Sequence, residues 1–334
     1  MNFDNIRLDK GLYTTGKSFT QALEEIDPSE NYIGTELEGL DAFQRQLKRF
    51  DIKVSGKNSD PIEKFFRTTD SAALFPEYIS RSVAQGVDST DILDSIVATT
   101  TKIEGLDYRS VTTENCEDAY QPSVIAEGAF VPETKIVTKD KLVHLHKCGR
   151  MLSASYEAIR FQRIDLFTVA LRQIGIGIAR AQLADAIEVL IYGASDSAPA
   201  KTVTAENSTV SFANLLKLWD ALSPYNLSTL IASPDVMLKL LALPEFRDSY
   251  KGLDFHASGK MITPLGAELF KHEPLNADTL LALDKTCALE KIEAMPVTTE
   301  FDKLIDRQLE RASITTIAGF SKIFEGACAV MSFE

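Results

Sequence analysis

The chain has 334 residues, of which 45% are hydrophobic and 25% are charged, and its formal net charge is −13. These proportions are typical of a globular protein that is large enough for one big domain or two modest ones. The negative charge argues against tight electrostatic binding to nucleic acid. The four cysteines contain no CxxC pair, and their spacing does not indicate a set of disulfides. This favours reduced thiols in a cytoplasm.

The N-terminal region is predicted to be irregular up to residue 33 and helical after it. Glycines and an Asp-Pro pair interrupt the polar sequence before that point. Over residues 35–50 apolar residues recur at intervals of three and four, which predicts a helix with one narrow apolar stripe. A loose linker follows at residues 56–61, so we expect the stripe to lack a local core and to dock on the main body or on a neighbouring subunit. The stripe consists of Leu37, Leu40, Phe43, Leu47 and Phe50.

Helical patterns are then expected over residues 77–85 and 91–97, followed by a pair of strands. Residues 108–112 lead outward, and the chain returns from Lys141. Between them, residues 113–140 are rich in Glu, Asp, Gly and Pro and have no core pattern. A segment of this length without secondary structure usually has a function or a contact outside its domain. The alternative is a mobile, solvated loop.

The longest helix signal covers residues 166–192. A strand pattern over residues 142–153 and a short helix over 155–162 precede it. Asp165 is expected to be the N-cap, and Gly193 stands where a left-handed residue would end the helix. Apolar residues cover most of its surface, which predicts that the helix is buried on most sides.

Charged residues within this helix exclude a membrane span, because no uncharged run approaches the roughly 18 residues that a span needs. Its two interior glycines cost about 1 kcal/mol each relative to alanine. We therefore expect close approach of another element, or a bend, at that point. The residues expected to pack there are Ile174, Gly175, Gly177 and Ile178.

Beyond Gly193 the pattern is that of a mixed α/β unit. A polar stretch over residues 194–211 leads to an amphipathic helix from Phe212. Ser233 and Pro234 mark the start of another helix. Strands are expected around residues 226–232, 268–270, 280–284, 292–297, 314–317 and 327–331, with a charged stretch at 298–311.

Motifs of known chemistry are missing from the sequence. The dinucleotide-binding fingerprint, the phosphate-binding loop, the nucleophile elbow and the HExxH zinc motif do not occur. His144, His146 and Cys148 alternate along a predicted strand and would share one face, so zinc binding is an alternative there. No fourth ligand is indicated and Lys147 and Arg150 lie beside them, so we favour a structural role. We predict no catalytic residue, no metal and no cofactor.

The order of these patterns resembles that of tailed-phage major capsid proteins, which have the α+β Hong Kong 97 fold. The resemblance rests on residues 74–79, residues 127–133, the strand and the corner with Glu157, and the long helix that ends at Tyr192 and Gly193. It implies an N-terminal arm, an extended hairpin called the E-loop, a peripheral domain with a long spine helix, and an axial α/β domain. The implied boundaries are 1–74 for the arm, 75–111 for the first part of the peripheral domain, 112–141 for the E-loop, 142–193 for the peripheral strand and spine helix, 194–296 for the axial domain, 297–313 for the peripheral return, and 314–334 for the C-terminal axial strands.

The resemblance also implies a function. Such a major head protein forms pentamers and hexamers of itself that close into an icosahedral shell around a phage or phage-like genome. Implied partners are a separate scaffolding protein, a portal and packaged double-stranded DNA contacted weakly and without sequence preference; no membrane is involved. The location is the virion, after assembly in the cytoplasm of a bacterial host. The alternatives are an encapsulin-like nanocompartment shell and an α/β enzyme whose site is not recognised.

In a shell of this kind the arm and the E-loop make the contacts between subunits. Acids outnumber lysines in the E-loop, so we expect a basic landing surface on the neighbour, with most contact through shape and apolar groups. The expected assembly residues are Ile125, Phe130, Val131, Glu133 and Lys135 in the E-loop and Leu37, Leu40, Phe43 and Leu47 in the arm.

Covalent cross-linking of subunits is not expected. The phage that names the fold joins an E-loop lysine to an asparagine in the peripheral domain of a neighbour. Lys135 and Lys139 could supply the amine here, but residues 297–313 contain no asparagine and none follows Asn276. The resemblance therefore implies a shell held by non-covalent contacts.

Overall fold

The computed structural model describes residues 6–8, 10–13, 19–89, 92–113, 124–131, 133–247, 261–273, 275 and 278–333. The chain divides into two compact units. The first comprises Met1–Thr90, Cys148–Ala179 and Pro296–Thr316, and the second comprises Asp91–Lys147, Arg180–Met295 and Ile317–Glu334.

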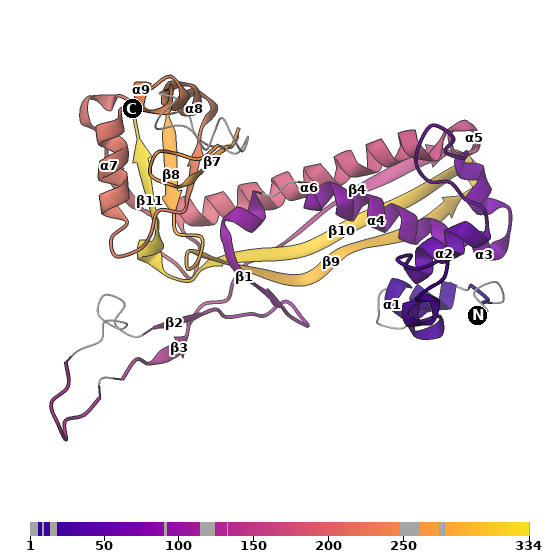
Figure 1. Cartoon of the computed structure of the whole chain (residues 1–334), viewed down its shortest axis with the longest axis horizontal. Helices are drawn as coiled ribbons and strands as arrows, with labels where there is room; N and C mark the ends of the chain where they lie inside the picture. The colour runs from indigo at the N-terminus through magenta and orange to yellow at the C-terminus, as the bar shows by residue number, and fades with distance from the viewer. Residues whose placement is uncertain are drawn as a thin grey trace. The chain divides into compact units, whose positions relative to one another are not determined.

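Helices and strands alternate along the chain without a simple repeat (Figure 1). The helices are α1 (Phe19–Ile26), α2 (Ala42–Arg49), α3 (Thr69–Ala72), α4 (Leu74–Asp88), α5 (Tyr156–Phe161), α6 (Ile164–Tyr192), α7 (Phe212–Ala221), α8 (Pro234–Leu241) and α9 (Pro244–Arg247). The strands are β1 (Val97–Lys102), β2 (Val111–Thr113), β3 (Ile136–Thr138), β4 (Leu145–Ser155), β5 (Lys201–Thr204), β6 (Thr229–Ala232), β7 (Glu268–Lys271), β8 (Thr279–Leu283), β9 (Leu289–Leu304), β10 (Leu309–Lys322) and β11 (Cys328–Ser332).

The strands form a four-stranded sheet in the order β1-β9-β10-β4, a five-stranded sheet in the order β5-β11-β8-β6-β7, and a two-stranded sheet of β2 and β3. Of the second expected helix only a 3-10 turn, Leu93–Ser95, is present, and strand β1 follows it without having been expected. It contains three consecutive threonines, whose β-branched side chains favour extended backbone, and it pairs in parallel with β9. Strand β5 and helix α1 were not expected, because both lie in stretches that read as polar.

The first unit is built around the close approach of α4 and α6. A Cβ atom added to Gly175 would overlap the carbonyl oxygen of Val83, and one added to Gly86 would overlap that of Arg172. Only glycine lets the two backbones come this close, so the expected close approach at Gly175 is confirmed. At Gly177 no other element approaches closely, because an added Cβ would meet no atom within 4 Å.

Helix α6 matches its predicted end better than its predicted start. It begins at Ile164, so Asp165 lies in the first turn instead of forming the N-cap. Gly193 has φ +78°, and its N–H donates to the carbonyl of Val189 at 3.0 Å, which confirms it as the left-handed terminator. Ile178 is buried and Ile174 packs against the same core at partial burial. Among the helices that the structure describes, none has the length and apolar character of a bilayer span.

The apolar stripe of the N-terminal region packs into the core of the first unit, so docking on the main body, one of the two expected alternatives, is confirmed. Phe43 and Leu47 are 3% and 6% exposed, and Phe19 and Leu23 of α1 join them in the core of the first unit. Helix α2 begins at Ala42 and not at residue 35, because the stretch before it turns twice through left-handed glycines. The Asp41 carboxylate then caps the helix by accepting the N–H of Gln44 at 2.8 Å, and the Gln44 side chain accepts the N–H of Asp41.

A buried arginine organises the same region. The Arg45 side chain is fully buried, and its Nε lies 2.8 Å from the Asp27 carboxylate. Its guanidinium also donates to the carbonyl of Leu40 at 2.6 Å and lies 4.3 Å from the centre of the Tyr32 ring. The Tyr32 hydroxyl donates to the same Asp27 at 2.6 Å. These contacts fix the loop between α1 and α2 against α2, so this loop is ordered without many apolar residues.

The five-stranded sheet is the centre of the second unit. Strands β6 and β8 are buried along their whole length. Helices α7 and α8 cover one face with Leu215, Leu218, Val236 and Leu240, and the C-terminal half of α6 covers the other with Leu183, Ile187 and Leu190. The mixed α/β unit predicted from the sequence is therefore present. Strands β6, β7, β8 and β11 lie where strands were expected, whereas β9 and β10 extend beyond their expected ranges into the charged stretch at 298–311.

Candidate functional site

Strands β2 and β3 belong to a hairpin that projects as an extended loop (Figure 1), and residues 124–131 and 133–138 of it are exposed. Strands β2 and β3 pair in antiparallel fashion, with Val111 opposite Thr138 and Thr113 opposite Ile136. The return strand was expected from Lys141 onward, so it begins earlier than predicted; from Lys141 the chain leads instead into β4. The predicted hairpin itself is present.

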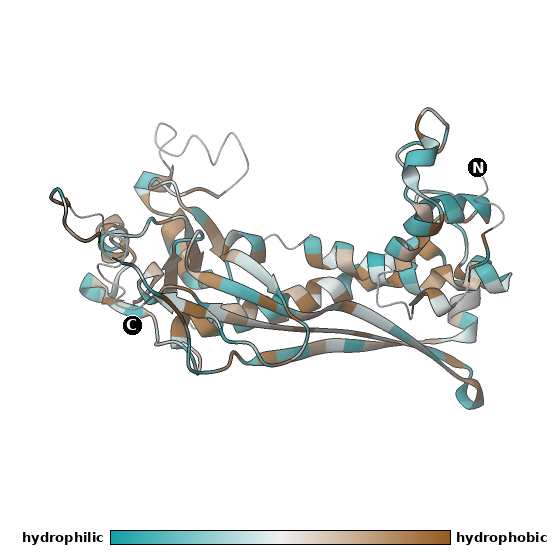
Figure 2. Cartoon of the chain, turned by 90° about the horizontal axis from the view of Figure 1, so that it is seen from below, coloured by the Kyte–Doolittle hydropathy of each residue, from teal (hydrophilic) through white to brown (hydrophobic). Residues whose placement is uncertain are grey.

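The tip of the hairpin is a tight turn that displays apolar side chains. The N–H of Ala129 donates to the carbonyl of Ala126 at 3.0 Å, and Gly128 has φ +80°. A turn that needs a left-handed third residue favours glycine there. Phe130 follows it and is 100% exposed, and Val131 is 73% exposed. Figure 2 shows the hydrophobic colouring in this part of the hairpin.

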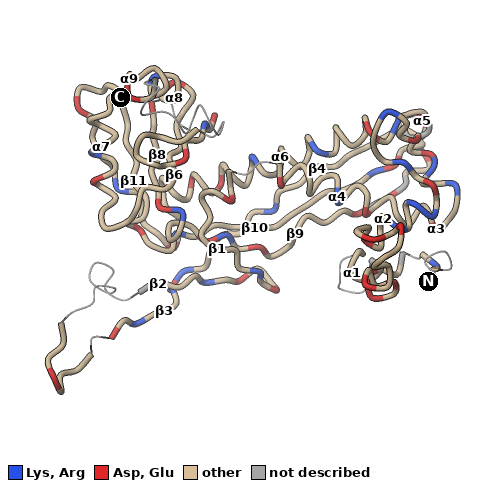
Figure 3. The backbone as a smooth tube through the Cα atoms, in the orientation of Figure 1, with Lys and Arg blue, Asp and Glu red and all other residues tan. Residues whose placement is uncertain are grey.

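The charge of the tip is negative. Between residues 124 and 133 the sequence has two carboxylates, Glu127 and Glu133, and no lysine or arginine. Both side chains are exposed, and in the described part of the chain neither has a hydrogen-bond or ion-pair partner. Figure 3 shows the colour of Asp and Glu, without that of Lys and Arg, at the described tip of the hairpin. Of the other four acids between residues 113 and 140, Asp140 is exposed, and Glu114, Glu117 and Asp118 lie outside the described residues. Ile125 is 41% exposed at the tip, and Lys135 is exposed in the return leg.

The outgoing leg of the hairpin is anchored at its root by Glu290, which is 5% exposed. The Glu290 carboxylate accepts hydrogen bonds from the hydroxyls of Thr101 at 2.5 Å, Tyr108 at 2.7 Å and Ser110 at 2.5 Å. Burial, together with this carboxylate, raises the pKa of Tyr108 above its ordinary value. A buried carboxylate with three donors fixes the position of the leg strongly.

The return leg is anchored by Lys139. Its Nζ donates to the carbonyl of Lys322 at 2.7 Å and to Ser321 Oγ at 3.3 Å, and it lies 3.2 Å from the fully buried Asp196 carboxylate. The N–H of Lys139 also donates to the carbonyl of Ser110 at 2.9 Å, which ties the two legs together. The hairpin therefore has a rigid root and an exposed tip. Lys139 is consequently not an available amine for cross-linking.

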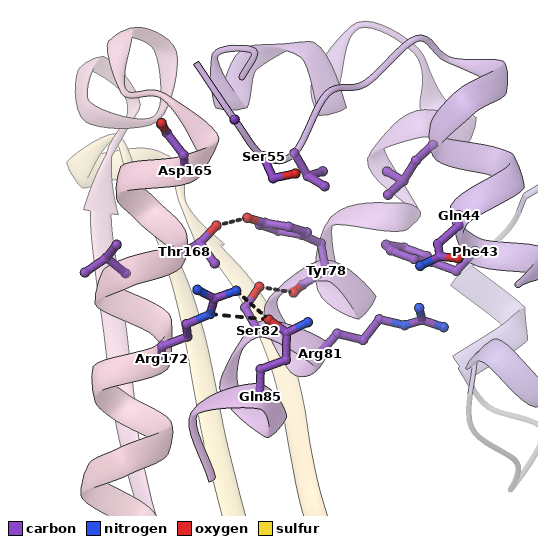
Figure 4. A pocket seen from close by; sticks show the side chains of 14 residues that line it. Phe43, Gln44, Ser55, Tyr78, Arg81, Ser82, Gln85, Asp165, Thr168 and Arg172 are labelled. Carbon is purple, nitrogen blue, oxygen red and sulfur yellow. Dashed lines mark hydrogen bonds between the residues drawn. The ribbon is translucent and has the colours of Figure 1, made fainter. Parts of the chain in front are cut away.

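A pocket of about 480 Å³ lies in the first unit among α2, α4 and α6 (Figure 4). Its floor contains the buried Phe43, Leu47 and Tyr78, and the side chain of Val169 on its wall is 53% exposed. Figure 4 shows the Tyr78 hydroxyl joined to the Thr168 hydroxyl by a hydrogen bond. Burial raises the pKa of Tyr78 above its ordinary value, so it stays neutral at physiological pH.

Two arginines line this pocket and differ in their partners. Arg81 is neutralised, because its guanidinium lies 2.7 Å from the Asp41 carboxylate and 2.9 Å from that of Glu77. Arg172 is exposed and donates to the Gln85 amide oxygen at 2.8 Å. No carboxylate of the described residues forms a salt bridge with Arg172.

The sequence-predicted residues fall into separate groups. Ile125, Phe130 and Val131 gather at the hairpin tip, with Glu133 and Lys135 following them. Of the arm residues, Phe43 and Leu47 are taken up by the core, whereas Leu37 and Leu40 are half-buried and remain predicted contact residues. The pocket, its arginine and the two root anchors were not predicted. No signal in the sequence joins Glu290 to Tyr108, since these residues are far apart in the chain.

The zinc alternative has no geometric support in the described part of the chain. His146 Nδ1 lies 3.1 Å from the Asp185 carboxylate, while His144 is exposed and Cys148 is half-buried. Among the described residues no three His, Cys, Asp or Glu side chains are placed to hold a metal ion. The Cys287 thiol is a poor nucleophile, because burial raises its pKa to about 11.

A family model and several solved structures are similar to this chain. The family model described as phage capsid protein matches residues 138–308, slightly more than half of the chain. No curated protein sequence matches the chain.

Solved structures are similar to the chain at low sequence identity. The virus-like particle from Pyrococcus furiosus is 14% identical with a TM-score of 0.51, over 77% of this chain and 98% of that one. Gordonia phage Cozz is 14% identical with a TM-score of 0.52, over 72% and 86%. The SrpI encapsulin complex from Synechococcus elongatus PCC 7942 is 13% identical with a TM-score of 0.50, over 73% and 87%. At such identity the likeness shows the fold alone, and that is the Hong Kong 97 fold predicted from the sequence.

Proposed function

The chain belongs to the phage capsid protein family, and on this premise we propose that it is the major head protein of a phage or phage-like particle. As a capsid protein it is a structural component of a virion shell built from many copies of itself. Its role is mechanical: each copy must hold its neighbours through contacts that close into rings.

One observation supports this role beyond family membership. The hairpin has a rigid root and a tip that presents a fully exposed phenylalanine, with no core of its own. A monomeric protein gains nothing from placing a large apolar side chain there, since burial of such a side chain is worth about 1.5–3 kcal/mol. We propose that contact with another copy supplies the missing burial and that residues 112–141 are the E-loop.

The two units correspond to the expected domains with shifted limits. The first unit corresponds to the peripheral domain, and it includes the region named the arm, because that region has a buried core there. The second unit corresponds to the axial domain together with the E-loop. The half-buried Leu37 and Leu40 are the arm residues proposed to contact a neighbouring subunit.

The proposed partners follow from charge and from the fold. A net charge of −13 is compatible with a shell that encloses DNA without binding it tightly, because the DNA phosphates and the acidic protein repel each other weakly at physiological salt. A separate scaffolding protein and a portal complete the particle. Assembly takes place in the cytoplasm of a bacterial host, where the thiols stay reduced.

Electron microscopy of the purified chain, produced alone and together with the neighbouring genes of its source, tests the proposal. We expect closed icosahedral shells, and we expect nuclease-protected double-stranded DNA in particles made with the complete gene set. Shells that enclose a protein cargo and no DNA would support the encapsulin-like alternative. A chain that stays monomeric under all of these conditions would contradict the proposal and leave the enzyme alternative.

A further inference from the structure

We propose that the pocket among α2, α4 and α6 of one copy receives the hairpin tip of another copy, with Phe130 on the pocket floor and a tip carboxylate on Arg172. This inference rests on the proposed function and names the surface that the hairpin binds. It rests on the shape, polarity and charge of the hairpin tip and of the pocket, because neither surface is covered by other described residues.

The shape of the hairpin tip is compatible with insertion into a pocket. The turn closed between Ala126 and Ala129 is narrow, and the residue after it exposes its whole aromatic ring. Aromatic side chains contribute most to interfaces when they fill a pocket from which water is excluded. The tip therefore needs an acceptor with an apolar floor and a volume large enough for one ring and its neighbours.

The pocket meets that description. Its volume of about 480 Å³ accommodates several side chains. Phe43, Leu47 and Val54 line it with apolar groups, although the Arg81 guanidinium lies 4.4 Å from the centre of the Phe43 ring, and the half-exposed Val169 supplies an apolar wall on α6. Filling the pocket with Phe130 and Val131 would cover both this wall and the apolar groups of the tip.

The charges of the hairpin tip and of the pocket are complementary. Glu127 and Glu133 flank the apolar tip, and neither carboxylate has a partner in the described part of the chain. Arg172 is the pocket cation that no described carboxylate neutralises, since Arg81 is already paired with Asp41 and Glu77. Asp165 also lines the pocket and lies 3.8 Å from Arg163. An arginine at the edge of an apolar pocket favours an anionic partner segment over a basic one.

A disulfide trap tests the contact directly. Phe130→Cys and Val169→Cys are introduced together into a chain in which Cys116 and Cys148 are replaced by serine, and assembled shells are oxidised. We expect covalent dimers and longer chains on a non-reducing denaturing gel, because each copy donates a tip and offers a pocket. Both positions are exposed, so the subunit should fold as before.

The matched control keeps the cysteine at the hairpin tip and changes only the position of the second cysteine. Arg180 is exposed on the same helix, eleven residues and about 16 Å beyond Val169. The pair Phe130→Cys and Arg180→Cys should give at least tenfold less covalent product in the same shells. Equal cross-linking of both pairs, or a product that remains a monomer, would overturn the inference.

A charge exchange tests the electrostatic part. Arg172→Glu should weaken the contact about tenfold and reduce shell yield, and so should Glu127→Arg combined with Glu133→Arg. The triple variant should recover yield, because the opposite charges again face each other across the contact, whereas Arg180→Glu should leave yield unchanged. Failure of recovery together with no disulfide in normal shells overturns the pocket assignment alone. Absence of shells from the parent chain overturns the proposed function, and the inference with it.

Discussion

The N-terminal region and the hairpin are similar in sequence and opposite in structure. Both are polar and both contain glycine turns. The N-terminal stripe was expected to dock on the main body or on a neighbouring subunit, and the hairpin on a neighbouring subunit. In the N-terminal region Phe19, Leu23, Phe43 and Leu47 are buried. In the hairpin every described residue from 124 to 131 is exposed.

The difference lies in a buried polar residue and not in the number of apolar ones. Arg45 joins α2 to the preceding loop through Asp27, Tyr32 and the carbonyl of Leu40. In the described part of the hairpin, contacts with buried charges lie at the root, where Tyr108 and Ser110 bind Glu290 and Lys139 binds Asp196. A buried network can therefore order a segment with a narrow apolar stripe, whereas the same composition without a network stays extended.

The largest effect should come from removing the hairpin. Deleting residues 114–135 and joining Thr113 to Ile136 through Asn-Gly keeps the β2–β3 register and both root anchors. We expect a soluble, folded subunit, judged by circular dichroism and gel filtration, that forms no closed shell under the electron microscope. Deleting residues 1–52 should instead give an unfolded or insoluble chain, because it removes part of the core. Normal shells from the hairpin deletion would contradict the E-loop assignment.

The second prediction concerns the arginine network. Arg45→Met leaves the Asp27 carboxylate buried without its cation, which should lower the free energy of unfolding by about 3–5 kcal/mol. Urea denaturation followed by circular dichroism measures this change. Lys48→Met on the exposed side of the same helix should change it by less than about 0.5 kcal/mol. Equal stability of the two variants would show that Arg45 does not organise this region.

The third prediction separates two glycines of α6. Gly175→Ala forces a Cβ atom against the Val83 carbonyl, so the helices must move apart, at a cost of about 1–3 kcal/mol. Gly177→Ala meets open space and should stabilise the helix by about 1 kcal/mol. The denaturation midpoints of the two unassembled variants should therefore shift in opposite directions. A shift in the same direction would mean that the α4–α6 approach is looser than described.

The last prediction is that mature particles contain no covalent oligomers. Mature particles boiled in detergent with a reductant should give one band near the 36.8 kDa monomer. Of the two hairpin lysines, Lys139 is held at the root, and the chain has no asparagine after Asn276 to accept an amine. A ladder of covalent oligomers would show that the hairpin contact is covalent after all.

Much of the fold could be predicted because its signals are local. The end of α6 at Gly193, the start of α7 behind Ser211 and the buried strands β6 and β8 follow from residues that are adjacent in sequence. The hairpin was predicted for the same reason, since a long stretch without core pattern is visible in sequence alone. Strand β1 was missed because its three threonines are too short a signal to outweigh the helical pattern around them.

Only the tertiary structure decided which polar residues are buried and which apolar residues stay outside. Arg45, Glu290 and Lys139 look like ordinary surface residues in sequence, and their partners lie up to 183 positions away. Phe43 and Phe130 are equally apolar, yet the core covers one and leaves the other fully exposed. Burial depends on which segments the fold brings together, and that is a property of long-range packing that a local pattern does not contain.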